Sequence, residues 1–459
     1  ATLKGLRHGL LTAPDMPGLL DEANASSGAL DPWQRANLVE MRRLWTHAAA
    51  LTEGQVEALS KAQSKCETIW REARKTANFG LVLPSLETLL NLVREAAQAK
   101  AGTLGLGPYD SLLDEYEPGG RAADIDPVFA ELEAFLPDFL NSVLERQESN
   151  PPVLAPEGPF PVQNQQNLAR RLMQTIGFDF NHGRLDTSHH PFCGGVPEDV
   201  RITTRYDETD FSSALMGVLH ETGHALYDRG LPRDRRGQPV GEPRSMAVHE
   251  SQSLLIEMQV CRSPEFIIFA APLMREAFSG TGPAWETDNL IALQTRVERG
   301  LIRVDADEVT YPLHVILRYR LERAMIEGDL KPSDLPAAWN EGMEKLLGRV
   351  PGNDALGCLQ DIHWFDGAWG YFPTYTLGAM MAAQLFEAAK KADPAIPGGI
   401  EKGDFAPLLA WLGEKIHAKG SLTSSQTLIS EATGRPLDAT AFTDHLKRRY
   451  LGQTNNSLR

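Results

Sequence analysis

Helical spacing of apolar residues extends over most of this chain and constrains its fold more than any other feature. In residues 31–101 apolar and charged residues alternate with a helical period and few turn residues, which predicts long helices. Residues 126–144 continue as one helix or as a broken pair, because Pro137 interrupts the apolar face. After residue 211 the breaks are too short to be interdomain linkers. We expect a mainly α protein that forms a single body over residues 1–459.

One segment departs from the helical pattern. Residues 199–206 (DVRITTRY) are rich in β-branched side chains and alternate with period two, which predicts a strand of a small sheet. Val200 and Ile202 share one face, and Arg201 and Arg205 share the other. An edge strand can pair with an extended substrate backbone, whereas an internal strand has both edges occupied. The sequence leaves these alternatives open.

Charge and hydropathy exclude several classes of partner. The formal net charge of -16, from 45 basic and 61 acidic residues, opposes binding to nucleic acid or to anionic membranes. The most apolar run, residues 266–274, contains Pro272 and is about half as long as a membrane span. No export signal is visible, and the four cysteines are scattered as in proteins of reducing compartments. We therefore expect a cytoplasmic protein.

A metal-binding pattern lies on the helix predicted over residues 211–229. It carries His220, Glu221 and His224 in the order His-Glu-x-x-His. Residues four apart lie one turn above each other, so both imidazoles can reach one ion while Glu221 lies beside them. This spacing predicts a zinc peptidase in which the histidines bind the metal and Glu221 activates the water that attacks the peptide bond.

Catalytic zinc takes three protein ligands and leaves one position for water, so a third donor must come from elsewhere. Glu250 is the first candidate, because the helix predicted over residues 245–260 can return antiparallel to the same ion. His249 and Asp228 are rivals. His249 would make a three-histidine site, whereas Asp228, one turn after His224, is better placed to support a ligand imidazole.

Six motifs of this sequence resemble those of the carboxypeptidase Taq family of metallocarboxypeptidases. They are His190-Pro191-Phe192; Asp199, Arg201 and Thr203; His220 to His224; His249-Glu250-Ser251-Gln252; Ile302, Arg303, Ala306 and Asp307; and Gly357, Gln360, Asp361, His363 and Trp364. All six stand in the order of the family. Weaker similarity extends back to about Trp70, so the resemblance covers most of the chain.

The resemblance implies a gluzincin-like fold related to neurolysin and angiotensin-converting enzyme. Such a fold is an elongated helical body with a deep active-site groove and a small β-sheet, with helices of residues 1–150 covering the groove. The resemblance also implies Glu250 as the third zinc ligand. We expect one zinc ion per chain, at a site that can accept other divalent metals such as cobalt. The resemblance further implies removal of single C-terminal amino acids from peptides with broad specificity, and a homodimer.

Residues 361–378 hold candidates for stabilising the oxygen charge that develops during hydrolysis. By similarity to related helical zinc peptidases, Tyr375 and His363 are the first candidates, followed by Tyr371. The alternative is that this aromatic-rich segment is only a corner of the core.

A carboxypeptidase also needs a cation for the terminal carboxylate, which a guanidinium binds in a bidentate fork. Arg303 is the first candidate by resemblance, followed by Arg201 and Arg205 on the predicted strand. Arg303 could instead pair with Asp307 at the surface. Pro312 lies inside the following apolar pattern and predicts a kinked helix.

Three functions are compatible with the sequence. The first is a zinc carboxypeptidase acting on peptides. The second is a zinc endo-oligopeptidase or dipeptidyl carboxypeptidase, which would not release free amino acids. The third is a helical binding protein with structural zinc, which predicts a closed site of four ligands where the sequence offers three and a base.

Overall fold

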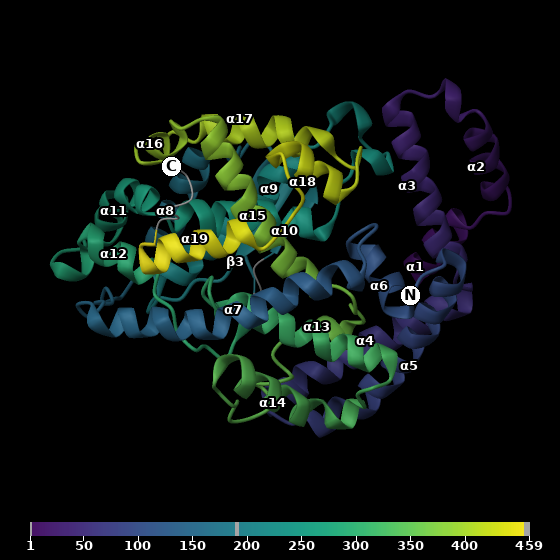
Figure 1. Ribbon diagram of the computed structural model, residues 1–459, viewed down its shortest axis with the longest axis horizontal. Helices are drawn as coiled ribbons and strands as arrows, with labels where there is room; N and C mark the ends of the chain where they lie inside the picture. The colour runs from purple at the N-terminus through teal and green to yellow at the C-terminus, as the bar shows by residue number, and fades with distance from the viewer. Residues whose placement is uncertain (1, 189–191, 454–459) are drawn as a thin grey trace. The chain divides into compact units, whose positions relative to one another are not determined.

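The computed structural model describes residues 2–188 and 192–453, and most of these residues lie in helices (Figure 1). The chain divides into two compact units. The first comprises Ala1–Leu140, Gln238–Val240 and Glu298–Thr376, and the second comprises Asn141–Gly237, Gly241–Val297 and Leu377–Arg459. Each unit is therefore assembled from segments far apart in the sequence, and the helices of residues 1–140 share a unit with residues 298–376.

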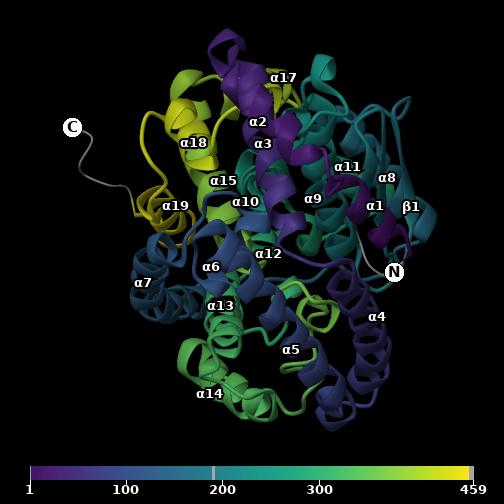
Figure 2. The same ribbon diagram turned by 90° about the vertical axis from the view of Figure 1, so that its right-hand side faces the viewer.

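The first unit contains no β-strand among the residues that the structure describes. Its helices are α1 (Thr2–Leu11), α2 (Met16–Ala25), α3 (Pro32–Ala49), α4 (Glu53–Lys75), α5 (Phe79–Leu104), α6 (Pro108–Tyr116), α13 (Tyr311–Glu327) and α14 (Leu335–Leu347). Helices α4 and α5 pack side by side (Figure 2). Asp31 and Thr52 begin α3 and α4 with capping boxes, in which each side chain accepts from the backbone N–H three residues on. The long helices predicted over residues 31–101 are confirmed.

The second unit combines helices with one small sheet. Its helices are α8 (Val162–Ile176), α9 (Phe211–Gly230), α10 (Met246–Leu254), α11 (Pro264–Phe278), α12 (Thr287–Gln294), α16 (Ile396–Ile400), α17 (Ala406–Lys415), α18 (Ser425–Thr433) and α19 (Thr440–Leu451). A π-helix, Leu255–Cys261, continues α10. Helices α7 (Ala122–Ser149) and α15 (Pro373–Ala392) begin in the first unit and end in the second. No helix in the described part of the chain is long and apolar enough to cross a membrane.

The predicted strand is β3 (Asp199–Thr204), and it lies in the middle of the sheet. It pairs in parallel with β1 (Gly183–Thr187) and antiparallel with β2 (Phe192–Val196), so the strand order is β1-β3-β2. The alternative that this strand offers a free edge to a substrate is wrong, because neighbouring strands occupy both of its edges. Val200 and Ile202, which were predicted to share one face, are both buried, and Arg201 is exposed.

Helix α9 packs against β3 and β2 and lies beside α10 (Figure 1). The helix begins where the Asp210 carboxylate accepts from the N–H groups of Ser212 and Ser213. Its first residue, Phe211, stacks on Trp285 with ring centroids 5.7 Å apart. Gly230 ends the helix, as the sequence predicts. Local sequence signals thus determine where α9 begins and ends, and packing against β3, β2 and α10 determines which of its faces are buried.

The effects predicted for Pro137 and Pro312 depend on where each proline lies in its helix. Pro137 lies inside α7, which runs unbroken from Ala122 to Ser149, so the single-helix alternative is correct. One proline removes one backbone donor, which a long helix tolerates. The kink predicted at Pro312 is wrong. Helix α13 begins at Tyr311, so Pro312 stands in the first turn, where no backbone N–H is needed.

Candidate metal centre and active site

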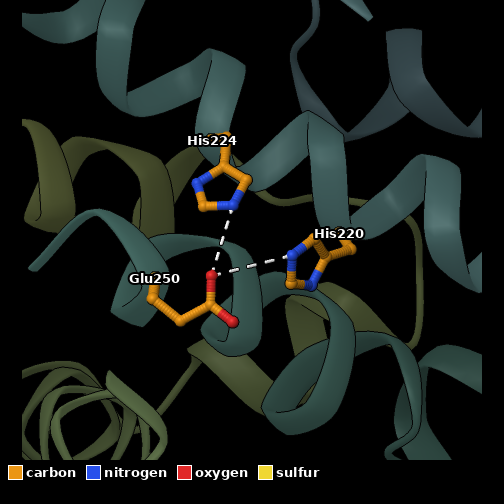
Figure 3. A group of neighbouring side chains, drawn as sticks. All are labelled: His220, His224 and Glu250. Carbon is orange, nitrogen blue, oxygen red and sulfur yellow. Dashed lines mark ion pairs between the residues drawn. The ribbon is translucent and has the colours of Figure 1, made fainter. Parts of the chain in front are cut away.

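Helix α9 presents His220 and His224 one turn apart, with ring centroids separated by 5.0 Å. Helix α10 supplies Glu250 opposite them (Figure 3). The Oε2 atom of Glu250 lies 3.8 Å from Nε2 of His220 and 3.4 Å from Nε2 of His224. The three potential ligand atoms all lie within 4.8 Å of one another. Two imidazole nitrogens and one carboxylate oxygen therefore converge as the sequence predicts.

This convergence requires close approach of neighbouring helices, and glycines permit it. Gly223 is the second variable residue of the His-Glu-x-x-His motif. A Cβ atom on Gly223 would lie 2.4 Å from the backbone oxygen of Gln252, so α9 and α10 are in close contact there. A Cβ atom on Gly378 of α15 would lie 2.8 Å from Cβ of Glu250. Both contacts are closer than any side chain allows, so these glycines help to fix where Glu250 lies.

A buried carboxylate supports His220 from behind. Nδ1 of His220 donates to Oε2 of Glu257 at 3.0 Å, which leaves Nε2 to face Glu250. Glu257 lies on the π-helix and pairs through Oε1 with Arg262 at 2.8 Å. Burial would raise the pKa of Glu257, but Arg262 and His220 outweigh burial and lower it. His220 thus has the carboxylate partner that is usual for a metal-binding histidine.

A second imidazole supports His224. Nδ1 of His224 lies 2.6 Å from Nδ1 of His249, and Nε2 of His249 lies 3.1 Å from Oδ1 of Asp228. If Nε2 of His224 faces a metal, its Nδ1–H donates to His249, whose Nε2–H donates to Asp228. His249 thus lies behind a candidate ligand. The sequence predicted that Asp228 would support a ligand imidazole directly. In the structure Asp228 contacts His249 instead.

The electrostatics of this cluster suit a divalent cation. Burial would lower the pKa of His220, but the carboxylates of Glu250, Glu257 and Glu221 outweigh burial and raise it to about 10. Burial raises the pKa of Glu221 to about 7 and lowers that of His224 to about 4. Excess negative charge in a buried site favours a bound cation. Two imidazole nitrogens and one carboxylate oxygen form a donor set that zinc accepts. Glu221 follows His220 directly in the sequence.

The first candidate for carboxylate binding, Arg303, lies in the first unit and is buried. Its Nε and Nη2 donate to Oδ1 of Asp361 at 3.0 and 2.8 Å. Oδ2 of the same carboxylate accepts from Nε of Arg318 at 2.6 Å. The alternative pairing of Arg303 with Asp307 is wrong. Asp307 instead accepts from the backbone N–H groups of Glu298, Val309 and Thr310.

His363 and Tyr375 meet in the same unit, where Nε2 of His363 lies 2.9 Å from the Tyr375 hydroxyl. Burial, and next the Arg303 cation, lower the pKa of His363 to about 3. The guanidinium of Arg303 lies 4.6 Å from the centre of the Tyr375 ring, and the ring of Tyr371 lies 5.2 Å from that of Tyr375. These candidates therefore form one cluster with a neutral imidazole.

The two arginines predicted on the strand are placed differently. Arg201 is exposed and pairs with Asp199 at 2.6 Å. Arg205 follows β3 and is also exposed. An exposed guanidinium holds a carboxylate less strongly than a buried one, because water screens the charge. Of the His-Pro-Phe motif, His190 and Pro191 lie outside the described residues.

Comparison with known proteins decides the family. A family model of the carboxypeptidase Taq (M32) metallopeptidases matches residues 1–450. The chain belongs to this family. It is 39% identical over 460 residues to thermostable carboxypeptidase 1 of Thermus thermophilus, covering 98% of this chain and 90% of that protein. The solved structure of Trypanosoma cruzi metallocarboxypeptidase 1 superposes with a TM-score of 0.94 at 45% identity, covering 96% of this chain and 89% of that one.

As a carboxypeptidase Taq metallopeptidase, the chain is a hydrolase that acts on peptides and uses a divalent metal ion. The mainly helical fold with a small sheet agrees with the solved carboxypeptidases of the family. A putative oligoendopeptidase F shares the fold alone, with 12% identity and a TM-score of 0.59. The expectation of a metallocarboxypeptidase is therefore confirmed.

Sequence reasoning missed two residues of these clusters. Glu257 lies seven residues after Glu250, which is two helical turns, so the spacing could have placed both on one face. Arg318 stands inside the apolar pattern of residues 308–325, where a charged residue points to a buried partner. Nothing in the spacing indicated that this partner would be Asp361.

Proposed function

We propose that this carboxypeptidase uses one zinc ion per chain, bound by His220, His224 and Glu250, with Glu221 as the general base. The convergence of the three ligand atoms within 4.8 Å carries this proposal. Zinc, when bound, acidifies water and polarises the carbonyl of the scissile bond. Cobalt is the main alternative metal, because it accepts the same ligands.

In this proposal some residues orient the metal ligands and another transfers the proton. Glu257 and His249 orient the imidazoles of His220 and His224 so that both Nε2 atoms face Glu250. Glu221 is buried and has a pKa of about 7, which suits a carboxylate that accepts a proton from water and passes it on.

Replacement of Glu221 by Gln tests the assignment. The variant should keep about one zinc per chain and lose activity by roughly 10²–10⁴-fold, because an amide cannot accept the proton. Metal content by atomic spectroscopy and kcat on a short peptide provide the two readouts. Loss of zinc together with activity would mean that Glu221 is a ligand. Refilling the chelated wild type with zinc or cobalt then compares the metals.

We infer further that Arg303 binds the C-terminal carboxylate of the substrate, with Arg201 and Arg205 as the alternatives. Support comes from its burial and from the neighbouring Tyr375 and His363, the proposed donors to the developing oxygen charge, with Tyr371 next to them. A charge-assisted contact of this kind contributes about 1.5–3 kcal/mol. Cleavage should release single amino acids with broad side-chain specificity.

Amidation of the substrate C-terminus tests the carboxylate contact. It should lower kcat/KM by roughly two orders of magnitude, since each ~1.4 kcal/mol is tenfold. Arg303→Ala should lower activity on the free acid by a similar factor and have little effect on the amide. The same coupling in Arg201→Ala or Arg205→Ala would place the contact on the strand. Equal cleavage of acid and amide by the wild type would instead indicate an endopeptidase.

Assembly and location complete the proposal. We propose a homodimer, on the resemblance to the family, with helices of residues 1–150 covering the active-site groove. A cytoplasmic location is supported by the four cysteines, all of which are unpaired in the structure. Sedimentation across a range of concentrations tests the dimer.

A further inference from the structure

The carboxylate of Asp361 is shared between two buried guanidiniums. Its Oδ1 accepts from Arg303 and its Oδ2 accepts from Arg318. The side chain of Arg318 is 0% exposed and those of Arg303 and Asp361 are 7% and 9% exposed. One negative charge therefore faces two positive charges in a region from which water is largely excluded. We call these three residues the arginine cluster.

Aromatic rings surround the arginine cluster. The guanidinium of Arg318 lies 4.4 Å from the ring centre of Trp339, and both guanidiniums lie within 5.8 Å of the ring centre of Phe372. Aromatic faces attract a cation without neutralising its charge. The net charge of the arginine cluster is therefore +1, which a buried site retains at a cost unless an anion binds.

Asp361 contacts only one side of the Arg303 guanidinium. Nε and Nη2 of Arg303 donate to Asp361, whereas Nη1 has no protein acceptor among the residues described. Arg318 is held on its other side, because its Nη1 donates to the backbone oxygen of His314 at 2.8 Å. Arg318 is thus fixed behind Asp361, on the carboxylate oxygen that Arg303 does not use.

If only Arg303 and Asp361 were present, they would form a neutral pair with little attraction for a second carboxylate. We propose that Arg318 is a positioning residue that keeps the arginine cluster cationic, so that Arg303 can bind both Asp361 and the C-terminal carboxylate of a peptide. Arg318 acts through Asp361 and need not touch the substrate. The inference rests on the proposed role of Arg303 and explains why a second arginine is buried behind it.

A purely structural role for Arg318 makes a different prediction. Buried ion pairs are often replaceable by apolar residues without loss of stability, so structure alone does not require a guanidinium here. A structural role would affect folding, and it would affect cleavage of every substrate alike. A charge-supplying role should affect only substrates with a free C-terminal carboxylate.

Charge balance provides the test. Arg318→Met makes the arginine cluster neutral and should raise KM for a free-acid peptide by about tenfold, which corresponds to ~1.4 kcal/mol, with little change in kcat. Cleavage of the amidated peptide and zinc content should stay unchanged. Arg320→Met is the matched control, because Arg320 lies on the same helix but is exposed and pairs with Glu133. Arg318→Lys keeps the charge and should stay close to the wild type in KM.

The double variant Arg318→Met with Asp361→Asn distinguishes charge from structure. It removes one charge of each sign and restores a net charge of +1 on Arg303, so KM for the free acid should return toward the wild-type value. Thermal midpoints of all variants report folding separately. If Arg318→Met affects acid and amide equally, or if the double variant is weaker than the single one, Arg318 is structural and the inference is overturned. Equal cleavage of acid and amide by the wild type would overturn the carboxylate contact of Arg303 itself, and the inference with it.

Discussion

Two buried clusters of charged side chains, one in each unit, carry charge of opposite sign. Around His220 and His224 lie the carboxylates of Glu250, Glu257 and Glu221, and they raise the pKa of His220 to about 10. Around Asp361 lie two guanidiniums, which outweigh burial and hold the pKa of Asp361 well below its usual range. The first cluster suits a cation and the second an anion. Buried charge left uncompensated thus indicates the sign of the ligand that each cluster accepts.

A third buried carboxyl group, Glu322, has neither a metal-ligand neighbour nor a guanidinium partner among the hydrogen bonds that it accepts from the described residues. Glu322 of the first unit is fully buried and accepts from the Tyr109 hydroxyl at 2.6 Å and from Nε1 of Trp364 at 3.0 Å. Both of these donors are neutral. Burial raises the pKa of Glu322 to about 8. The side chain of Asp361 is also largely buried, at 9% exposed, but its carboxylate stays ionised because two guanidiniums contact it.

The largest effect is expected from removing Glu250, the proposed third metal ligand. Glu250→Ala should weaken zinc binding by more than the roughly 10–100-fold typical of residues that only support a ligand, because it deletes a donor. His249→Ala should stay within that range. Titration of each variant against a chelator of known zinc affinity measures both. The reverse order would make His249 the third ligand.

The next effect concerns the stability of the arginine cluster. Asp361→Asn leaves two buried guanidiniums without a counter-charge and should lower the free energy of unfolding by about 3–5 kcal/mol. Zinc affinity should not change. Urea unfolding gives the value, and Asp334→Asn, an exposed change of the same kind in the same unit, should cost less than about 0.5 kcal/mol. Equal costs would show that water reaches the arginine cluster.

A smaller effect is expected from the carboxylate behind His220. Glu257→Gln should weaken zinc binding by roughly 10–100-fold, since the amide orients Nδ1 but adds no negative charge. The exposed Glu276→Gln in the same unit is the control and should leave affinity unchanged. Unchanged affinity in Glu257→Gln would mean that Glu257 only pairs with Arg262.

A pH dependence of stability is expected to arise from Glu322. Its pKa is raised from 4.5 to about 8 on folding, so between these values the unfolded chain loses a proton that the folded chain keeps. Stability should therefore fall as pH rises through this window, by at most ~1.4 kcal/mol per pH unit, and should level off above it. Glu322→Gln should remove this slope. Unfolding curves of both proteins from pH 5 to pH 8 decide it, and parallel dependence would show that Glu322 is ionised when folded.

Local sequence signals located most of the elements that carry the proposed metal site. Helix α9 begins after Asp210 and ends at Gly230 as predicted, and α10 begins after the capping residue Ser245. The π-helix that follows α10 was not predicted, because apolar spacing does not distinguish it from an α-helix over so few residues. The kink predicted at Pro312 was wrong, because a proline is accommodated in the first turn of a helix but bends the helix when it lies further inside, and the sequence did not show where the first turn lies.

The spacing of His220, Glu221 and His224 was enough to predict that both imidazoles lie on one side of a helix with Glu221 beside them, because this arrangement follows from helix geometry alone. Glu250 was one of three candidates for the third ligand, and the packing of α10 against Gly223 of α9 places its Oε2 atom within 3.8 Å of Nε2 of both histidines. The partners of Arg303 and the middle position of β3 could not be predicted and were found only in the folded structure, because both depend on segments far apart along the chain. Helical periodicity reports contacts within a turn or two. Ion pairs across a unit and the order of strands in a sheet leave no such local trace.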